Sequence, residues 1–584
     1  MTAPPEGNQL SYVPSPAPPA RPAVRFGRRA PWRTLTVVLP ACWILIAGWN
    51  HRWIGDDGLI YTRVVRQILA GNGPVFNVDE RVETSTGTLW QWLVAAATLP
   101  TGKDPATVAV WLGLVLCTAG FVLALLGTLG LYGRPTRVVP LGVVALLPVQ
   151  ATWDYATSGL ETGLAFCWLG ATWWALVHTG RSGRHLVPVA VLLGLGPLVR
   201  PDLSLVTALY AVVLYALVRP APRRALTALV AGLALPVGYE IFRAGYYGIL
   251  VPLPAVTKEA SWTLWDRGLF YLADFVAPYQ LWLPLALLAA LSVPVAAALG
   301  DASDGRRTLV IASAPVVAGL ASALFVTKVG GDFMHGRMLL PGLFLVLLPV
   351  FLVPLTRIAA SALAALTVWA GACLLLWRPP HTNDDGSHFV VDEHTGYVNV
   401  TDQDHPVTQS AHAARTFLFA REARRLTAAG ERVVLIETSY DRKVEALPLS
   451  ARRHPAIRFA GVEARLGHAG VAIPLTESAT DSLSLANPVG AHTHPVVFRK
   501  AGHEKPINRA WVIADYTDPS PADSPAVRAA RHAMTCGPIA ELRDSARSPL
   551  TASRFWHNLI GSWERTRLRI PADPAAAERQ FCVK

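Results

Sequence analysis

Long apolar runs recur through the first two thirds of the sequence and constrain its fold more than any other feature. A helix needs about 20 mostly apolar residues to cross a bilayer, and about eleven runs approach this length. They lie at residues 33–50, 107–131, 138–152, 159–179, 186–199, 203–218, 225–243, 278–299, 308–327, 338–355 and 359–377. Because 52% of the residues are hydrophobic and 16% are charged, the chain is too apolar for a soluble protein. We predict a polytopic α-helical membrane protein with about eleven transmembrane helices.

Arginines in the short loops predict the orientation of the chain. If the N-terminus is cytoplasmic, five arginine-containing loops face the cytoplasm, as the positive-inside rule requires. These loops are 132–137, 181–184, 219–224, 301–307 and 356–357. The chain then divides into a disordered cytoplasmic tail (1–32), a transmembrane domain (33–378) with a first outer loop at 51–106, and an extracytoplasmic domain (379–584). We expect a multi-pass protein of the plasma membrane.

The C-terminal domain alternates two kinds of segment. ERVVLIETSY (431–440) and RAWVIADYTD (509–518) have the pattern of strands, and AARTFLFAREARRLTAAG (413–430) has that of a helix. Together they predict a mixed α/β cap domain. Cys536 and Cys582 form a disulfide only if the fold brings them together, and the sequence leaves this open.

The charge of the chain argues against one class of function. The formal net charge is +12, but Lys and Arg are spread over the loops and the C-terminal domain rather than gathered on one face. The C-terminal domain also has no nucleotide-binding loop or hydrolase elbow. The expected partner is therefore the lipid bilayer, and no nucleic acid is expected.

Two adjacent carboxylates, Asp56 and Asp57, follow the first apolar run in HRWIGDDGLIYTR (51–63). Residues 57–70 place apolar and basic side chains with helical periodicity and Gly71 follows as a stop signal, which predicts an amphipathic helix lying on the membrane. A role as the N-terminal cap of this helix explains one aspartate, because a carboxylate accepts hydrogen bonds from the free backbone N–H groups there. The second needs another partner, so structural and catalytic roles both stay open.

Four cations are predicted near the outer ends of the spans. The segment GGDFMHGRMLLP (330–341) contains an arginine beside glycines on the predicted outer side of the membrane, where the positive-inside rule makes arginine uncommon. An arginine at such a position favours an anionic ligand. An arginine that reaches lipid headgroups is the structural alternative, and an ion pair with Asp202 is the alternative for Arg200. The predicted phosphate ligands are His335, Arg337, Lys258 and Arg200.

Two polar stretches on the same side, ETSTGTLWQW (83–92) and TWDYATSGLETG (152–163), supply groups that bind sugars. Aromatic rings stack on sugar faces, but Trp and Tyr also populate membrane interfaces without such a role. The candidate sugar or acceptor ligands are Asp332, Glu161, Trp153, Tyr155 and Glu83.

These residue types together suit chemistry on a lipid-linked phosphosugar. A polyprenyl phosphate is a serviceable leaving group, so cations need only stabilise charge on its oxygens. A carboxylate then deprotonates the acceptor hydroxyl, attacks the anomeric carbon or stabilises an oxocarbenium-like transition state. Asp56 and Asp57 are the predicted catalytic pair.

The same segments resemble a known family. An acidic motif after the first helix, followed by an interfacial helix, is similar to the GT-C class of integral-membrane glycosyltransferases. More narrowly, GDDGLIYTR, TSGLETGL, GGDFMHGRMLLP, DSLSLANPVG and GHEKP resemble segments of the arabinofuranosyltransferase B family, whose members add terminal β-(1→2)-arabinofuranose to actinobacterial cell-wall arabinan. GGDFMHGR is the most specific of these segments.

The resemblance implies a decaprenyl-phosphate β-D-arabinofuranose donor and an arabinogalactan or lipoarabinomannan acceptor. A β donor that gives a β linkage means net retention, which requires a covalent intermediate on a carboxylate or a same-face attack. No cofactor is certain. A divalent cation bridging the aspartates to phosphate stays open, although adjacent acids are a poor metal signature. The cap domain is expected over the outer cavity, where it would help to hold the polysaccharide acceptor.

Other functions remain as alternatives. Another polyprenyl-phosphate-sugar-dependent GT-C glycosyltransferase would share these parts. A transporter predicts charges through the depth of the membrane and a repeat between its halves, whereas these ionisable groups gather at one end. A non-enzymatic wall-assembly protein would not need the aspartates of the first outer loop.

Overall fold

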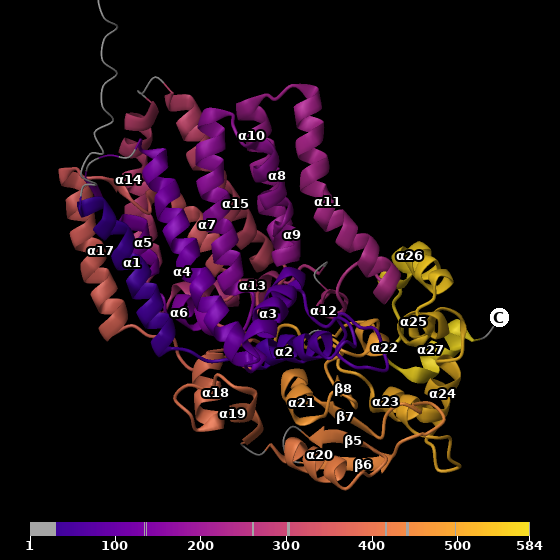
Figure 1. Ribbon diagram of the computed structural model, residues 1–584. Coiled ribbons are helices and arrows are strands. Elements are labelled where there is room, and N and C mark those ends of the chain that lie inside the picture. The colour runs from indigo at the N-terminus through magenta and orange to yellow at the C-terminus, as the bar shows by residue number, and fades with distance from the viewer. Residues whose placement is uncertain are drawn as a thin grey trace, which may run out of the picture.

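The computed structural model describes residues 31–133, 135, 137–259, 262–300, 304–414, 417–439, 443–496 and 498–582. It shows a bundle of helices with a smaller body against one end (Figure 1). We call residues 379–582 the tail domain, and the end of the bundle that they cover the tail end. The predicted cytoplasmic tail, residues 1–32, falls almost wholly outside the described residues.

Six of the described helices are long and apolar enough to cross a membrane. They are α1 (Pro31–Asn50), α4 (Pro105–Leu131), α10 (Ser204–Val218, preceded by η1, Pro201–Leu203), α11 (Pro222–Tyr247), α15 (Gly305–Lys328) and α17 (Arg357–Leu375). A seventh span is formed if α6 (Gln150–Thr157) and α7 (Thr162–Ser182) cross together, bent by 108° at the break between them. The protein is therefore a polytopic, mostly helical membrane protein.

The predicted count of about eleven spans is not confirmed by this length criterion. Three of the predicted runs form shorter apolar helices in the described part of the chain. They are α8 (Leu186–Gly194) with α9 (Gly196–Val199), α14 (Trp282–Gly300), and α16 (Leu340–Leu347) with η2 (Leu348–Val350). The run at 138–152 divides into β1 (Val138–Val139), α5 (Leu141–Leu146) and the start of α6, because Pro140 and Pro148 interrupt helical hydrogen bonding.

The helices α4 and α7 pack closely at the centre of the bundle. Gly113 and Gly120 on α4 face Gly163 and Gly170 on α7, and a Cβ atom added to Gly170 would lie 2.1 Å from the carbonyl oxygen of Gly120. Small residues allow this approach of two backbones, which drives helix association where lipid removes the hydrophobic driving force.

Two helices, α2 (Asp56–Leu69) and α3 (Thr88–Thr101), lie across the tail end of the bundle (Figure 1). The predicted amphipathic helix is thus present, but it is covered by the tail domain instead of lying on an open membrane surface. The Arg63 side chain is fully buried and donates to the backbone carbonyls of Gly470 and Ile473. The basic face of α2 therefore satisfies protein acceptors rather than lipid headgroups.

Glycines shape the loop GGDFMHGR between α15 and α16. Gly331 and Gly336 have φ angles of 69° and 66°, a region that favours glycine. A Cβ atom would lie 2.5 Å from Tyr271 at the first position and 2.6 Å from Phe275 at the second. Both rings belong to α13 (Trp265–Val276), which follows the short α12 (Leu253–Thr257). The loop can therefore pack against α13 and turn its polar residues toward the tail end.

The tail domain confirms the predicted mixed α/β class. Its four-stranded sheet has the order β6–β5–β7–β8, with β5, β7 and β8 parallel and β6 antiparallel at one edge. The strands of this domain are β3 (Thr382–Asp384), β4 (Phe389–Val391), β5 (Val433–Ser439), β6 (Lys443–Pro448), β7 (Phe459–Glu463) and β8 (Ser478–Asp481), while β2 (Val353–Pro354) pairs with β1 in the bundle. The helices are α18 (Glu393–Thr401), α19 (Gln409–Ala414), α20 (Leu418–Ala428), α21 (Leu466–Ala472), α22 (Pro488–Ala491), α23 (Arg509–Tyr516), α24 (Pro525–Ala533), α25 (Gly537–Arg547), α26 (Ala552–Arg567) and α27 (Pro574–Phe581).

The strand predicted at residues 509–518 is wrong, because Arg509–Tyr516 form the helix α23. Asn508 caps this helix by accepting a hydrogen bond from the Ala510 N–H. The helix is buried on nearly all sides, Trp511 and Tyr516 included, so its apolar run lacks the periodicity that separates helix from strand. The helical segment predicted around α20 is confirmed.

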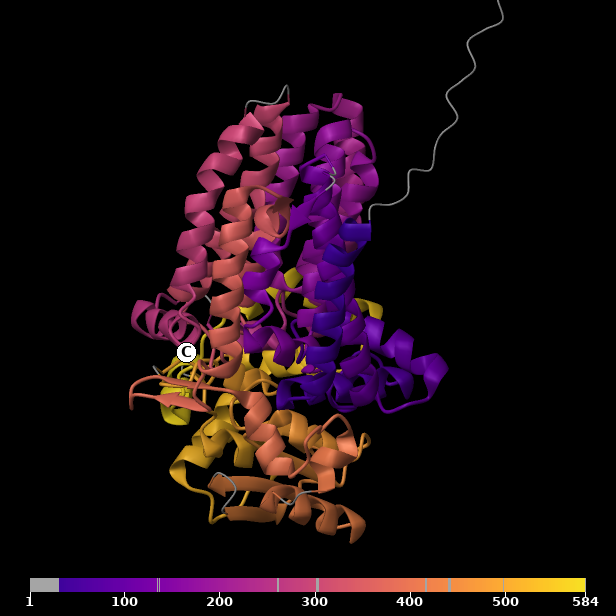
Figure 2. The same ribbon diagram turned by 90° about the vertical axis from the view of Figure 1, so that its left-hand side faces the viewer.

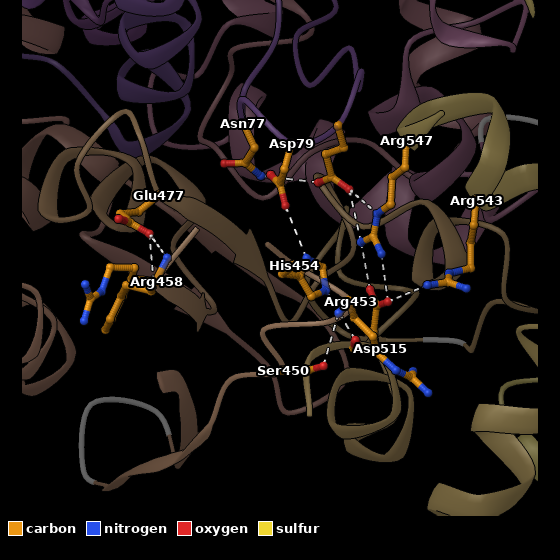
Figure 3. A network of polar contacts seen from close by, with 12 residues as sticks. Asn77, Asp79, Ser450, Arg453, His454, Arg458, Glu477, Asp515, Arg543 and Arg547 are labelled. Atoms are coloured by element: carbon orange, nitrogen blue, oxygen red, sulfur yellow. Dashed lines mark hydrogen bonds and ion pairs between the residues drawn. The ribbon is translucent and has the colours of Figure 1, made fainter. Parts of the chain in front are cut away.

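Ion pairs hold the first loop of the bundle to the tail domain. Arg547 lies 2.8 Å from Asp515 and 3.3 Å from Glu80, and His454 lies 3.4 Å from Asp79 (Figure 3). A view turned by 90° likewise shows the tail domain against one end of the bundle (Figure 2). Within this domain, a disulfide joins the cysteines at positions 536 and 582.

Candidate active site

Arg337 lies at the centre of a group of acidic side chains at the tail end. Its Nη1 is 3.3 Å from Asp57 Oδ2 and 3.6 Å from Asp332 Oδ2, and its Nη2 is 3.8 Å from Glu161 Oε1. These carboxylates come from α2, the loop after α15 and the break between α6 and α7. Burial lowers the pKa of Arg337, but the charges of Asp332, Glu161 and Asp57 outweigh this effect and raise the pKa above its ordinary value. The Arg337 guanidinium is therefore always charged, and it forms ion pairs with carboxylates from three segments that are distant in the sequence.

Glu161 connects this centre to a second arginine. One carboxylate oxygen lies 3.8 Å from Arg200 Nε, and the other accepts a hydrogen bond of 3.0 Å from the Tyr61 hydroxyl. Arg200 also pairs with Asp202 at 3.0 Å, so the ion pair considered as its structural alternative is present. Because Arg200 and Glu161 are almost fully buried, they form a framework around Arg337 rather than an open ligand site.

A small open pocket lies beside Asp57 and Arg337, and Lys258 also lines it. Lys258 is exposed, so its ammonium group is accessible to a ligand. The Nε of Arg337 and the hydroxyl of Thr84 are buried without a hydrogen-bond partner among the described residues. Unmet donors beside an accessible cation suit a phosphate group. The other lining residues are Ile60, Tyr61, Ser85, Thr86, Leu160, Pro254 and Leu485.

Asp56 points away from this pocket, although it is the neighbour of Asp57. Its carboxylate accepts hydrogen bonds from the backbone N–H groups of Gly467 and His468, at 3.1 and 2.8 Å, and lies 2.6 Å from His468 Nδ1. Burial raises the pKa of Asp56, but the bonds to His468 and Gly467 outweigh burial and leave it below its ordinary value. Asp56 thus caps the tail-domain helix α21 and does not cap its own helix.

His335 is bound within a buried chain of polar groups instead of facing the pocket. Its Nδ1 lies 2.7 Å from Asp274, and its Nε2 lies 3.1 Å from the Tyr279 hydroxyl. Asn383, on β3 of the tail domain, donates to the other oxygen of Asp274 at 2.9 Å. Both ring nitrogens of His335 are therefore occupied, so the structure does not place it with the proposed phosphate ligands.

Three of the candidate sugar ligands are also engaged elsewhere. Glu83 forms an ion pair of 2.7 Å with Arg243 on α11. The indole N–H of Trp153 donates to a backbone carbonyl at 2.5 Å, and the ring of Tyr155 lies 6.5 Å from that of Trp53. Of the sugar candidates, Asp332 and Glu161 belong to the group around Arg337, whereas these three stabilise the packing around it.

Two tail-domain residues near the acidic group were missed by sequence reasoning. Burial and the charge of Asp57 raise the pKa of Glu393 to about 8, against an opposing effect of Lys500. The Oε2 of Glu393 is buried without a partner among the described residues, and Lys500 Nζ lies 4.1 Å from the centre of the Phe333 ring. Neither residue stands in a recognisable motif, although Lys500 comes shortly before the segment GHEKP.

One group of side chains has the donor set of a metal site. His51, Asp154 and His394 bring their ligand atoms within 4.8 Å of one another, and His51 Nδ1 is 3.1 Å from Asp154 Oδ1. A mixture of imidazole and carboxylate suits a transition metal such as Zn²⁺ better than Mg²⁺. Asp56 and Asp57, for which the sequence left a bridging ion open, have different partners, since Asp57 lies beside Arg337 and Asp56 beside His468.

A pocket lined by a carboxylate and two cations, at one end of a bundle of membrane-spanning helices, has the features of the active site of an integral-membrane enzyme. A model of the AftB family C-terminal domain matches residues 448–580. The chain is 34% identical to the terminal β-(1→2)-arabinofuranosyltransferase of Mycobacterium tuberculosis over 90% of this chain and 93% of that protein. It is 39% identical to the Corynebacterium glutamicum protein of the same name over 64% of this chain and 59% of that protein. The chain belongs to this family of glycosyltransferases. No solved structure matches it.

Proposed function

We propose that the protein transfers D-arabinofuranose from decaprenyl-phosphate arabinose to the non-reducing ends of arabinan in arabinogalactan or lipoarabinomannan. The product is a terminal β-(1→2) linkage formed with net retention. The names of the relatives support the sugar and the linkage. The observation that carries the proposal is the pocket in which Asp57, Arg337 and Lys258 meet.

The proposed roles follow from the position of each group. Lys258, as the accessible cation, meets the phosphate of the donor, and Arg337 contributes its unmet Nε–H while it holds Asp57 in place. Asp57 faces the anomeric carbon as a nucleophile or as a stabiliser of positive charge, and either role is compatible with retention. The bond from the anomeric carbon to the phosphate oxygen breaks, and its electron pair leaves with decaprenyl phosphate. The oxygen of the acceptor 2-hydroxyl forms the new bond to the anomeric carbon, and its proton passes to the released phosphate. Asp56 acts as a positioning residue that fixes α21 beside the pocket.

We place the pocket and the tail domain on the extracytoplasmic side of the plasma membrane, with the bundle as a GT-C fold. The loop between α10 and α11, which contains Arg219, lies with the first turn of α11 at the end of the bundle away from the tail domain (Figure 1). Arg223 and Arg224 belong to that first turn. Arginine-rich short loops favour the cytoplasmic side. This orientation also gives the tail domain access to the cell-wall acceptor.

An assay with purified protein tests the proposal. Synthetic decaprenyl-phosphoarabinose and an arabinoside acceptor are incubated with the protein, and the product is analysed for linkage and anomeric configuration. We expect one β-(1→2)-linked arabinofuranose per acceptor end. Other polyprenyl-phosphate sugars serve as parallel donors. An α-linked product, or faster transfer from another sugar donor, would contradict the assignment.

A further inference from the structure

The helix α26 in the tail domain exposes a stripe of large apolar side chains. Trp556, Ile560 and Trp563 are 60%, 81% and 60% exposed. Their spacing of four and three residues places them on one face of the helix. An apolar stripe of this kind on a soluble domain marks an interaction surface.

The opposite face of α26 is fixed to the tail end of α11. Asn558 donates to the carbonyl of Gly245 at 3.1 Å, and Arg565 donates to the carbonyl of Gly248 at 2.8 Å. A Cβ atom on Gly245 would lie 2.2 Å from the Phe555 ring, so the two helices are in direct contact. The position of α26 along α11 is therefore set by packing and hydrogen bonds.

This contact places α26 at the end of a candidate membrane span. The candidate span of α11 ends at Tyr247, and the aromatic residues Phe242 and Tyr246 near this end are typical of the membrane–water interface. Along α11, Val237 and Ile241 are 49% and 48% exposed, as expected of a lipid-facing surface. Figure 1 shows α26 beside this end of α11, so its exposed apolar side chains lie close to the end of a candidate membrane span.

The chemistry of the exposed face favours lipid over water or protein. Beside the apolar stripe runs a polar one, formed by the exposed side chains of Ser553, His557 and Glu564. Arg567 at the end of the helix lies 5.3 Å from the centre of the Trp563 ring. An apolar stripe rich in Trp, a polar stripe and a terminal arginine are the marks of a helix that lies in the headgroup region.

We propose that α26 lies in the surface of the lipid bilayer and inserts Trp556, Ile560 and Trp563 among the headgroups. The tail domain is then anchored to the membrane at α26, in addition to its contacts with the bundle. This anchor would hold the part of the chain matched by the family model at a fixed height above the bilayer. The inference does not depend on the proposed donor or acceptor.

Spin labels on the full chain in lipid nanodiscs test this anchor. Cys42, the exposed free cysteine, is replaced by alanine, and single labels are introduced as Ile560→Cys and Trp556→Cys. His557→Cys is the matched control, because it lies on the polar stripe of the same helix. Power-saturation EPR then measures collisions of each label with oxygen, which partitions into lipid, and with a water-soluble nickel complex.

We expect the ratio of oxygen to nickel accessibility to be several-fold higher at positions 556 and 560 than at position 557. Equal nickel accessibility at all three positions would place α26 in water and overturn the proposal. Shielding of positions 556 and 560 from both reagents would overturn it as well, because it would show a protein partner. Spin–spin broadening that disappears on dilution with unlabelled protein would identify that partner as a second copy of the chain.

Discussion

Arg337 lies 3.3 Å from Asp57 although 280 positions separate them in the sequence. The contact joins the first loop of the bundle to the glycine-rich loop after α15, and it lies at the pocket that Lys258 also lines. The neighbouring Asp56 instead lies 2.6 Å from His468 in the tail domain. Two adjacent carboxylates therefore have different partners, and we expect their substitution to have different consequences.

Substitution Asp57→Asn should reduce kcat/KM by about 100-fold or more, because an amide cannot supply the negative charge required at the anomeric carbon. Its effect on the melting temperature should be small, since Asp332 and Glu161 still pair with Arg337. The matched control is Asp202→Asn, which removes a carboxylate from the same region but not from the pocket lining. Equal losses of activity in both variants would contradict a specific role for Asp57.

Substitution Asp56→Asn should loosen the contact between α2 and α21. The folded-state pKa of Asp56 lies below its ordinary value of 3.8. Its ionisation therefore contributes stability that is complete above about pH 4 and is lost as the pH falls through the lowered pKa. Thermal unfolding between pH 3 and pH 7, with hydrogen exchange of α21 at neutral pH, measures both effects. If wild type and Asp56→Asn lose stability in parallel on acidification, the carboxylate does not have this role.

Substitution Arg337→Ala should destabilise the protein by about 3–5 kcal/mol, because it leaves buried carboxylates without their countercharge. Arg337→Lys should recover part of this loss, since a lysine keeps the charge but cannot reach several carboxylates with a planar fork. Both variants should bind the donor more weakly. Melting temperature and donor binding are measured together, and an Arg337→Ala protein of wild-type stability would contradict the central position of this guanidinium.

Substitution Glu393→Gln should raise stability at alkaline pH. Burial raises the pKa of Glu393 from 4.5 to about 8 in the folded protein, so the folded state binds this proton more tightly than the unfolded state. The stability of the wild type should therefore fall as the pH rises from about 5 to 8, and the neutral amide removes this loss. The expected gain at pH 8 is on the order of 4 kcal/mol, since each pKa unit between 4.5 and about 8 corresponds to about 1.4 kcal/mol. A stability difference that does not change with pH would show that Glu393 ionises freely.

Part of the candidate site was visible in the sequence. Asp57, Arg337 and Lys258 stand in segments whose charge is unusual for their place beside apolar runs, and the structure brings them together. The partners of Glu83 and His335 were not visible, because Arg243 and Asp274 lie on other helices. No sequence motif marked Glu393 as a site residue, since its buried environment forms only where the tail domain contacts the bundle.

The sequence by itself determined that this chain is a helical membrane protein with a mixed α/β domain, because apolar length and periodicity are local properties. It also determined the family, because segments such as GGDFMHGR carry specific residues in fixed order. Only the tertiary structure decided which of the two aspartates faces the pocket and which one caps a helix of the tail domain. Those roles depend on the packing of segments more than 200 positions apart. A local sequence pattern cannot specify which distant residue a side chain will contact.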